Sequence, residues 1–162
     1  MIRWWTLIPL LLWAGAALAT PPVIEQLLIH KQERRLEVIS EGQIIRSYRI
    51  ALGRQPLGHK QYRGDNRTPE GIYHIDWRQR SPNYNLSLHL DYPNLKDRAE
   101  AWKRGADPGG MIMIHGTPID EDYPEWFFKG LDWTNGCIAL DNASMRELWE
   151  LVPDGTRVEI RP

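Results

Sequence analysis

Apolar residues, many of them β-branched, recur at alternate positions or in short continuous runs along much of the chain. Alternation with a period of two indicates a strand with one buried face, and a short apolar run bounded by turn residues is consistent with a buried strand. The segments with these patterns are 23–30, 35–40, 44–52, 71–77, 86–92, 111–115 and 156–162. Short polar breaks separate the first three segments, which predicts a strand meander with tight turns.

Two segments predict helices instead. Residues 94–104 suit a short polar helix, which Asn94 can cap and which Gly105 can end. A second helix follows Asp141, its predicted N-cap, because apolar residues recur there at helical spacing and predict a stripe that faces the core. The residues of this stripe are Met145, Leu148, Trp149 and Val152. Because strands outnumber helices, we predict a mainly β domain with one or two peripheral helices.

Two further segments lack a clear period and predict loops. Residues 53–70 contain glycines, prolines and charged residues, and a loop of this length inside a compact domain is usually functional. Residues 119–130 predict a loop with one helical turn.

The N-terminal segment has the layout of a secretory signal peptide. Arg3 supplies a positive charge, residues 4–18 are nearly all apolar, and residues 17–19 (Ala-Leu-Ala) fit a cleavage site. An uncleaved membrane anchor is the alternative, but the apolar run is shorter than the roughly 20 residues of a spanning helix. No cysteine follows the run to carry a lipid. We therefore expect a signal peptide at 1–19, and one exported domain at 20–162 with no stable membrane anchor after cleavage.

Composition and charge exclude several partners of this domain. The chain has 20 Lys and Arg residues against 21 Asp and Glu residues, so no excess of either sign points to nucleic acid. It contains no basic run that would mark a membrane-surface patch. The remaining chain is long enough for one domain with a core of its own.

The chain has a single cysteine, Cys137, between a glycine and a short apolar run. A lone cysteine can be a small buried hydrophobe, a partner for an intermolecular disulfide, or a nucleophile. Exported domains often pair their cysteines, and this one cannot form an internal disulfide. An unpaired thiol in an oxidising compartment is a candidate for chemistry, so we favour the nucleophile.

A thiol nucleophile needs a base within reach and donors for the developing oxyanion. His115 ends an apolar strand segment and is followed by Gly116, which lets a substrate approach closely. The other four histidines have nothing distinctive beside them, and we interpret them as surface or structural residues; they are His30, His59, His74 and His89. Gly136 leaves the backbone open before the thiol, so the N–H groups of Gly136 and Cys137 are candidate oxyanion donors.

Metal binding is the competing use of cysteine and histidine. The chain has no CxxC or HExxH spacing, so we expect no metal and no cofactor. Composition and spacing lead to an exported domain with a candidate Cys–His pair, and they do not identify a substrate.

Three motifs together resemble the catalytic domain of the L,D-transpeptidases, the YkuD-type family. They are Thr68-Pro69-Glu70-Gly71-Ile72-Tyr73, Ile114-His115-Gly116-Thr117 and Thr134-Asn135-Gly136-Cys137-Ile138. The family signature is a strand that ends in His-Gly, followed some twenty residues later by Ser/Thr-x-Gly-Cys-Ile/Leu. The resemblance covers about residues 23–161.

The resemblance implies a β-sandwich-like fold and a cysteine nucleophile that acts on peptidoglycan stem peptides. Cys137 would attack the carbonyl between the diamino acid at stem position 3 and the terminal D-alanine, and His115 would accept the thiol proton. The backbone carbonyl of Gly116 would orient the histidine ring. Thr134, Asn135 and Gly136 would shape the approach to the thiol and the oxyanion hole. An amine would resolve the thioester into a crosslink, an exchanged residue or an attached protein.

One residue departs from the common family pattern. Many members have arginine two residues after the cysteine, where this chain has Ala139. Some relatives with alanine there resemble hydrolases that detach proteins, such as an attached lipoprotein, from peptidoglycan. We expect a periplasmic transpeptidase, with a hydrolase as the alternative. A third alternative is a wall-binding module with a vestigial site, which would have no need for a thiol.

Overall fold

A computed structural model of the chain describes residues 21–118 and 123–162. The predicted signal peptide lies outside these residues, so the structure does not bear on it. No helix within the described ranges is long and apolar enough to cross a membrane.

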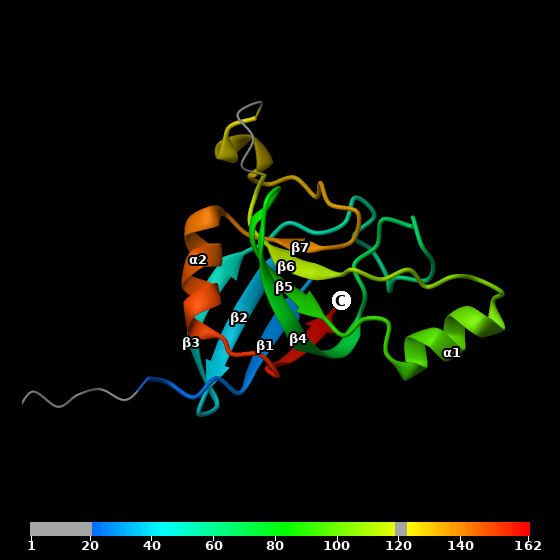
Figure 1. Ribbon diagram of the computed structural model, residues 1–162, viewed down its shortest axis with the longest axis horizontal. Helices are drawn as coiled ribbons and strands as arrows, with labels where there is room; N and C mark the ends of the chain where they lie inside the picture. Colours follow the sequence, from blue (N-terminus) through cyan, green and yellow to red (C-terminus); the bar gives the residue numbers. More distant parts are fainter. Residues whose placement is uncertain (1–20, 119–122) are drawn as a thin grey trace, which may run out of the picture.

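The described residues form eight strands, two α-helices and one short 3-10 helix (Figure 1). The strands are β1 (Gln26–His30), β2 (Arg35–Ser40), β3 (Gln43–Arg49), β4 (Gly71–Ser81), β5 (Asn85–Leu90), β6 (Met113–His115), β7 (Ile138–Ala139) and β8 (Arg157–Arg161). The helices are α1 (Leu95–Lys103), η1 (Glu125–Phe128) and α2 (Asn142–Leu151). The mainly β class predicted from the sequence is confirmed.

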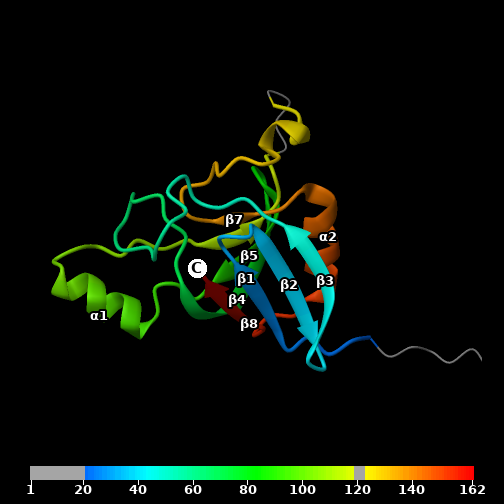
Figure 2. The same ribbon diagram turned by 180° about the vertical axis from the view of Figure 1, so that it is seen from behind.

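Across the described ranges, the strands form one sheet in the order β3-β2-β1-β8-β4-β5-β6-β7. Strand β4 belongs to both halves of this sheet. Its residues from Gly71 to His74 pair with β8, and those from Ile75 onward pair with β5. The register shifts between Ile75 and Trp77, and such a bulge bends a strand. The sheet therefore turns at β4 (Figures 1 and 2).

Apolar side chains from both halves of the sheet and from α2 form one core. Met145 and Leu148 of α2 are completely buried, and Val152 follows them into the core. Trp149 packs at the edge of the core and is only partly buried. The stripe predicted at helical spacing is therefore confirmed, and Asp141 caps α2 by accepting a hydrogen bond from the Ser144 N–H.

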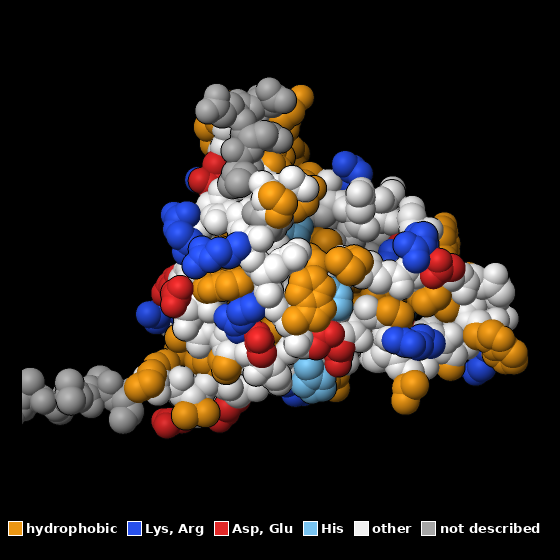
Figure 3. Space-filling model, viewed as in Figure 1, with side chains coloured by type: hydrophobic (Ala, Val, Ile, Leu, Met, Phe, Trp, Pro, Cys, Tyr) orange, Lys and Arg blue, Asp and Glu red, His pale blue; other side chains and the backbone are white. Residues whose placement is uncertain are grey.

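The helix after the β5 strand is also confirmed, together with its cap. Asn94 accepts a hydrogen bond from the Asp97 N–H, and Asp97 accepts one from the Asn94 N–H, which makes a capping box. Helix α1 extends away from the sheet, as does the segment around η1 (Figure 1). Figure 3 shows that acidic and basic side chains are interspersed over the face in view, as the balanced composition predicts.

The strands that carry the candidate residues differ from the prediction. The sequence predicts one strand over 111–115, but β6 begins only at Met113. Met111 has a φ of 57°, in the left-handed region that is incompatible with a strand, and its side chain is exposed. Strand β7 is only two residues long and was not predicted as a separate strand.

Candidate functional site

Strands β6 and β7 bring the candidate histidine and cysteine together. The strands are parallel, and His115 pairs with Ala139. Cys137 lies two residues before Ala139, and side chains two residues apart in an extended segment point to the same side. The register therefore places Cys137 diagonally from His115 on one face of the sheet, although 21 residues separate them in the chain.

The ring of His115 is fixed by one hydrogen bond and two aromatic neighbours. Its Nδ1–H donates to the carbonyl oxygen of Gly116 at 2.6 Å. A carbonyl can only accept, so the neutral ring carries its proton on Nδ1 and leaves Nε2 free to accept one. The rings of Tyr84 and Trp133 lie 4.6 Å and 5.6 Å from the imidazole, between centroids. The ring is thus buried, oriented and ready to act as a base.

The thiol of Cys137 is half-buried and lies at the wall of a pocket of about 460 Å³. Its Sγ lies 3.5 Å from the carbonyl oxygen of Met111. Lys60 and Arg63 also line the pocket, and both are ion-paired: the Lys60 Nζ lies 2.7 Å from Asp65, and the Arg63 Nε lies 2.7 Å from Asp107. The pocket therefore gives access to the thiol without an unpaired charge beside it.

Burial shifts the pKa values of both groups toward the neutral forms. Burial raises the pKa of the Cys137 thiol, against the opposing effects of the Met113 N–H and the Lys60 charge. Burial also lowers the pKa of His115, against its hydrogen bond to Gly116. At neutral pH the thiol and the imidazole are therefore both neutral, and the proton has to move when the thiol attacks.

This charge state predicts the pH dependence of thiol alkylation. Iodoacetamide reacts with the thiolate, and the raised pKa keeps the thiolate scarce at neutral pH. We expect the alkylation rate of Cys137 to rise with a midpoint above the ordinary thiol value of about 8.5. The alkylation rate is measured by stopped flow or mass spectrometry between about pH 5 and about pH 10. This range brackets the ordinary pKa values of His and Cys, and the rates locate the midpoint. A rate that is already on its plateau below neutral pH would reveal a thiolate–imidazolium pair and contradict the neutral state.

Thr134 fixes the turn that leads to the thiol. Its Oγ1 donates to the Cys137 carbonyl at 2.7 Å and accepts from the Gly136 N–H at 3.1 Å. The Gly136 N–H is therefore already used, and the expectation that it stabilises an oxyanion needs correction. The Cys137 N–H donates to no residue of 21–118 or 123–162, so it remains the backbone donor available at the thiol.

The other predicted residues around the thiol occupy distinct places. Asn135 is exposed at the rim of the thiol pocket, and its Oδ1 accepts from the Arg54 Nη1 at 2.6 Å. Gly136 has a φ of 131°, and a Cβ there would lie 2.7 Å from the Arg67 carbonyl oxygen. Only glycine fits this position, directly before the nucleophile.

Several residues that support the site were not identified from the sequence. Tyr84, in the turn between β4 and β5, and Trp133 pack on the His115 ring. Asp132 accepts from the Arg34 guanidinium and from the Leu52 N–H at 3.0 Å, which ties the segment before the cysteine to the β1–β2 turn and to the segment after β3. The sequence does not indicate these contacts. Its one relevant signal is that Trp133 directly precedes the cysteine motif.

The other four histidines have carboxylate neighbours, which supports the structural interpretation given from the sequence. The pairs are His30 with Glu37, His59 with Asp97, His74 with Asp91, and His89 with Asp76. His115 differs from them, because no ion pair with a carboxylate is found for it within the described ranges. As for metals, the described residues contain no group of three His, Cys, Asp or Glu side chains that could hold an ion.

A second pocket, of about 430 Å³, lies on the other side of Ala139 from the thiol. Its lining combines apolar and charged side chains. The apolar ones include Ala51, Phe128, Trp133, Ala139 and Leu140, and the charged ones are Arg49, Glu125, Lys129 and Asp141. Trp133 also packs against the His115 ring, with 5.6 Å between the ring centroids, although His115 itself does not line the pocket.

Comparison with known proteins gives a consistent result. The sequence model of the YkuD family, the L,D-transpeptidase catalytic domain, matches residues 25–160. YafK of Escherichia coli K12 is 29% identical over 130 residues, which are 76% of this chain and 45% of YafK. YqjB of Bacillus subtilis 168 is 26% identical over 136 residues, 82% of this chain and 69% of YqjB. Both carry L,D-transpeptidase in their names.

Among solved structures, the helical cell shape determining protein Pgp2 from Campylobacter jejuni is similar to this chain. It has a TM-score of 0.65 and 25% identity, and the match covers 87% of this chain and 50% of Pgp2. The chain thus spans about half the length of YafK and of Pgp2.

Proposed function

The chain belongs to the YkuD family of L,D-transpeptidase catalytic domains, and from this premise we propose that it is a cysteine acyltransferase of peptidoglycan stem peptides. The family acts on these peptides. The observation that carries the proposal is the pairing of a half-buried thiol with a histidine whose Nδ1 is held by Gly116 and whose Nε2 is free.

In the first half-reaction, the Cys137 Sγ attacks the carbonyl between the diamino acid at stem position 3 and the terminal D-alanine. The thiol proton passes to the His115 Nε2 as the S–C bond forms, and the Cys137 N–H donates to the oxyanion. When the C–N bond breaks, the imidazolium returns the proton to the leaving amine. The products are a thioester on Cys137 and free D-alanine.

In the second half-reaction, an amine attacks the thioester and gives its proton to His115, and the proton then returns to the departing sulfur. An amine on another stem peptide gives a crosslink, a free D-amino acid gives exchange, and an amine on a protein attaches that protein to the wall. The wall as substrate agrees with the similarity to Pgp2, which is named for determining cell shape.

Action on the wall requires export. The predicted signal peptide at 1–19 supports a periplasmic location for the domain at 20–162, and we propose this location on that ground.

Hydrolysis is a second candidate function, favoured by one observation. Ala139, next to the reacting pair, is buried and leaves open space in the second pocket, where many relatives carry arginine. Water and amines attack the same thioester, so both outcomes use the same residues.

Product analysis distinguishes transfer from hydrolysis. Residues 20–162 are mixed with disaccharide-tetrapeptide, with and without a D-amino acid acceptor, and with peptidoglycan that carries an attached lipoprotein peptide. We expect mass spectrometry to find crosslinked dimers or exchanged terminal residues. Tripeptide without dimer, or release of the attached peptide, would show a hydrolase and would contradict transfer while leaving the cysteine chemistry in place.

A further inference from the structure

The peptide unit between Gly116 and Thr117 carries the carbonyl that orients the candidate base. Strand β6 ends at His115, and the Gly116 N–H still donates to the Leu86 carbonyl oxygen at 3.2 Å. The Gly116 carbonyl instead accepts from the His115 Nδ1–H at 2.6 Å. The sheet therefore does not fix the direction of this carbonyl, and other contacts have to do so.

The direction of this carbonyl decides whether His115 can act as a base. A peptide unit is planar and turns as a whole, so half a turn would replace the carbonyl by the Thr117 N–H. That N–H would donate to Nδ1, and the neutral ring would then carry its proton on Nε2. A protonated Nε2 cannot accept the thiol proton. Proton transfer therefore requires the peptide plane to keep its present orientation.

Asn142, the first residue of α2, contacts both ends of this peptide unit. Its Nδ2 donates to the Thr117 Oγ1 at 2.8 Å. Its Oδ1 lies so close to the Gly116 α-carbon that a Cβ on residue 116 would overlap it. Gly116 and Thr117 are both buried. The Asn142 side chain thus restrains the plane that joins them.

Helix α2 itself does not depend on the Asn142 side chain. Asp141 caps the helix, and Asn142 binds η1 through its backbone, because its N–H donates to Glu125 at 2.5 Å. The Asn142 Oδ1 is buried and has no hydrogen-bond partner among the described residues. A buried unpaired oxygen costs stability. The side chain is therefore better explained by its contacts with the Gly116–Thr117 unit than by the folding of α2.

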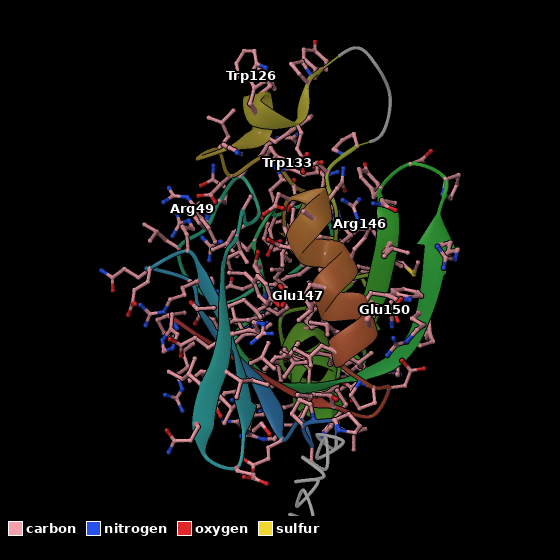
Figure 4. All side chains as sticks on the ribbon, turned by 90° about the vertical axis from the view of Figure 1, so that its left-hand side faces the viewer. Arg49, Trp126, Trp133, Arg146, Glu147 and Glu150 are labelled. Carbon is pink, nitrogen blue, oxygen red and sulfur yellow. The ribbon has the colours of Figure 1, made fainter. Side chains whose placement is uncertain are left out.

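The start of α2 lies at the histidine end of the molecule. Figure 4 shows Trp133 at the end where α2 begins. Trp133 packs against the His115 ring, and it lines the second pocket together with the N-cap Asp141. A residue fixed on a helix holds a neighbouring group more precisely than a residue on a loop does. Asn142 is therefore well placed to support the histidine segment.

We propose that Asn142 is a positioning residue that holds the Gly116 carbonyl against the His115 Nδ1 and thereby keeps Nε2 free for the thiol proton. This inference rests on the proposed function for the step that it serves. Asn142 acts through Gly116, so it affects proton transfer rather than substrate binding. The same contact requires glycine at position 116, because a larger residue would displace the amide.

The first test determines the tautomer of His115 without turnover. NMR shifts of isotope-labelled histidine nitrogens are recorded at a pH where the ring is neutral, and His115→Gln identifies the signals. We expect the Nδ1–H tautomer in the wild type and a measurable fraction of the Nε2–H tautomer in Asn142→Ala. Thr117→Val keeps the shape of the side chain but removes the hydroxyl that accepts from Asn142, and it should shift the tautomer in the same direction.

Ser144→Ala is the matched control. It removes a side-chain hydrogen bond of 2.6 Å to Asp141 in the same turn of α2, without a contact to the Gly116–Thr117 unit. It should keep the wild-type tautomer and the wild-type turnover. Thermal unfolding verifies that each variant folds, and alanine is well tolerated in a helix.

The second test separates kcat from KM. Asn142→Ala should lower kcat about tenfold, the scale of one hydrogen bond, and leave KM nearly unchanged. Asn142 and Thr117 act through one contact, so the double variant Asn142→Ala/Thr117→Val should be no slower than the slower single variant. A general loosening of the fold would not produce this combination with a shifted tautomer.

Several results would overturn the positioning role. They are an unchanged His115 tautomer in Asn142→Ala, an equal shift in Ser144→Ala, or a raised KM with unchanged kcat. Should Asn142→Ala not fold, Thr117→Val gives the same tautomer measurement, and an unchanged tautomer there would also overturn it. Failure of the proposed function is a separate result. Wild-type protein that never forms a thioester would refute that function, even where the tautomer depends on Asn142.

Discussion

Replacing Cys137 by alanine should abolish turnover of stem peptides, with a loss of about ten-thousandfold or more. The chain has no second thiol that could form the thioester in its place. The variant should also fail to react with a carbapenem, whereas the wild-type protein should gain the mass of one drug molecule. Steady-state kinetics and intact-protein mass spectrometry measure the two effects.

The substitution should leave the fold intact. The thiol is half-buried, and its contact with the Met111 carbonyl is long, at 3.5 Å, so little stability depends on it. Cys137→Ser is the matched variant, because it keeps the size of the side chain and replaces sulfur by a far weaker nucleophile. A drug adduct that persists in Cys137→Ala would remove this residue from the nucleophile role.

The second large effect concerns the base. His115→Gln should lower turnover roughly a thousandfold, because glutamine cannot take the thiol proton. The two residues act on one proton, so their losses should not multiply. The double variant should be hardly slower than Cys137→Ala alone.

His74→Gln is the control for this experiment. His74 is exposed and ion-paired with Asp91 at 3.2 Å, away from the thiol, so its replacement should change turnover little. Multiplied losses in the His115 and Cys137 double variant would indicate independent roles and would contradict a shared proton transfer. Thermal unfolding has to accompany the measurement, because the His115 ring is buried between Tyr84 and Trp133.

Local patterns were sufficient to predict the two α-helices and most of the strand segments. The helix caps Asn94 and Asp141 act within one turn, and the strand segments alternate over a few residues, so both signals are short-range. The order of the motifs likewise placed His115 at the end of a strand and Cys137 after a glycine. These are features that a linear sequence records directly.

Contacts between distant segments could not be predicted in this way. Arg34 and Asp132 are 98 residues apart, and their ion pair joins the β1–β2 turn to the segment before the cysteine. The use of the Gly136 N–H by Thr134 depends on the conformation of one turn, and not on residue type alone.

The central claim is that Cys137 becomes acylated by the stem peptide. Wild-type protein is mixed with disaccharide-tetrapeptide, quenched in acid within the first turnover, digested and mapped by mass spectrometry. We predict a tripeptide acyl group on the peptide that contains Cys137, linked as a thioester that hydroxylamine removes, together with one equivalent of D-alanine. D-alanine release with no acyl group on that peptide, or an acyl group on another residue, would contradict it.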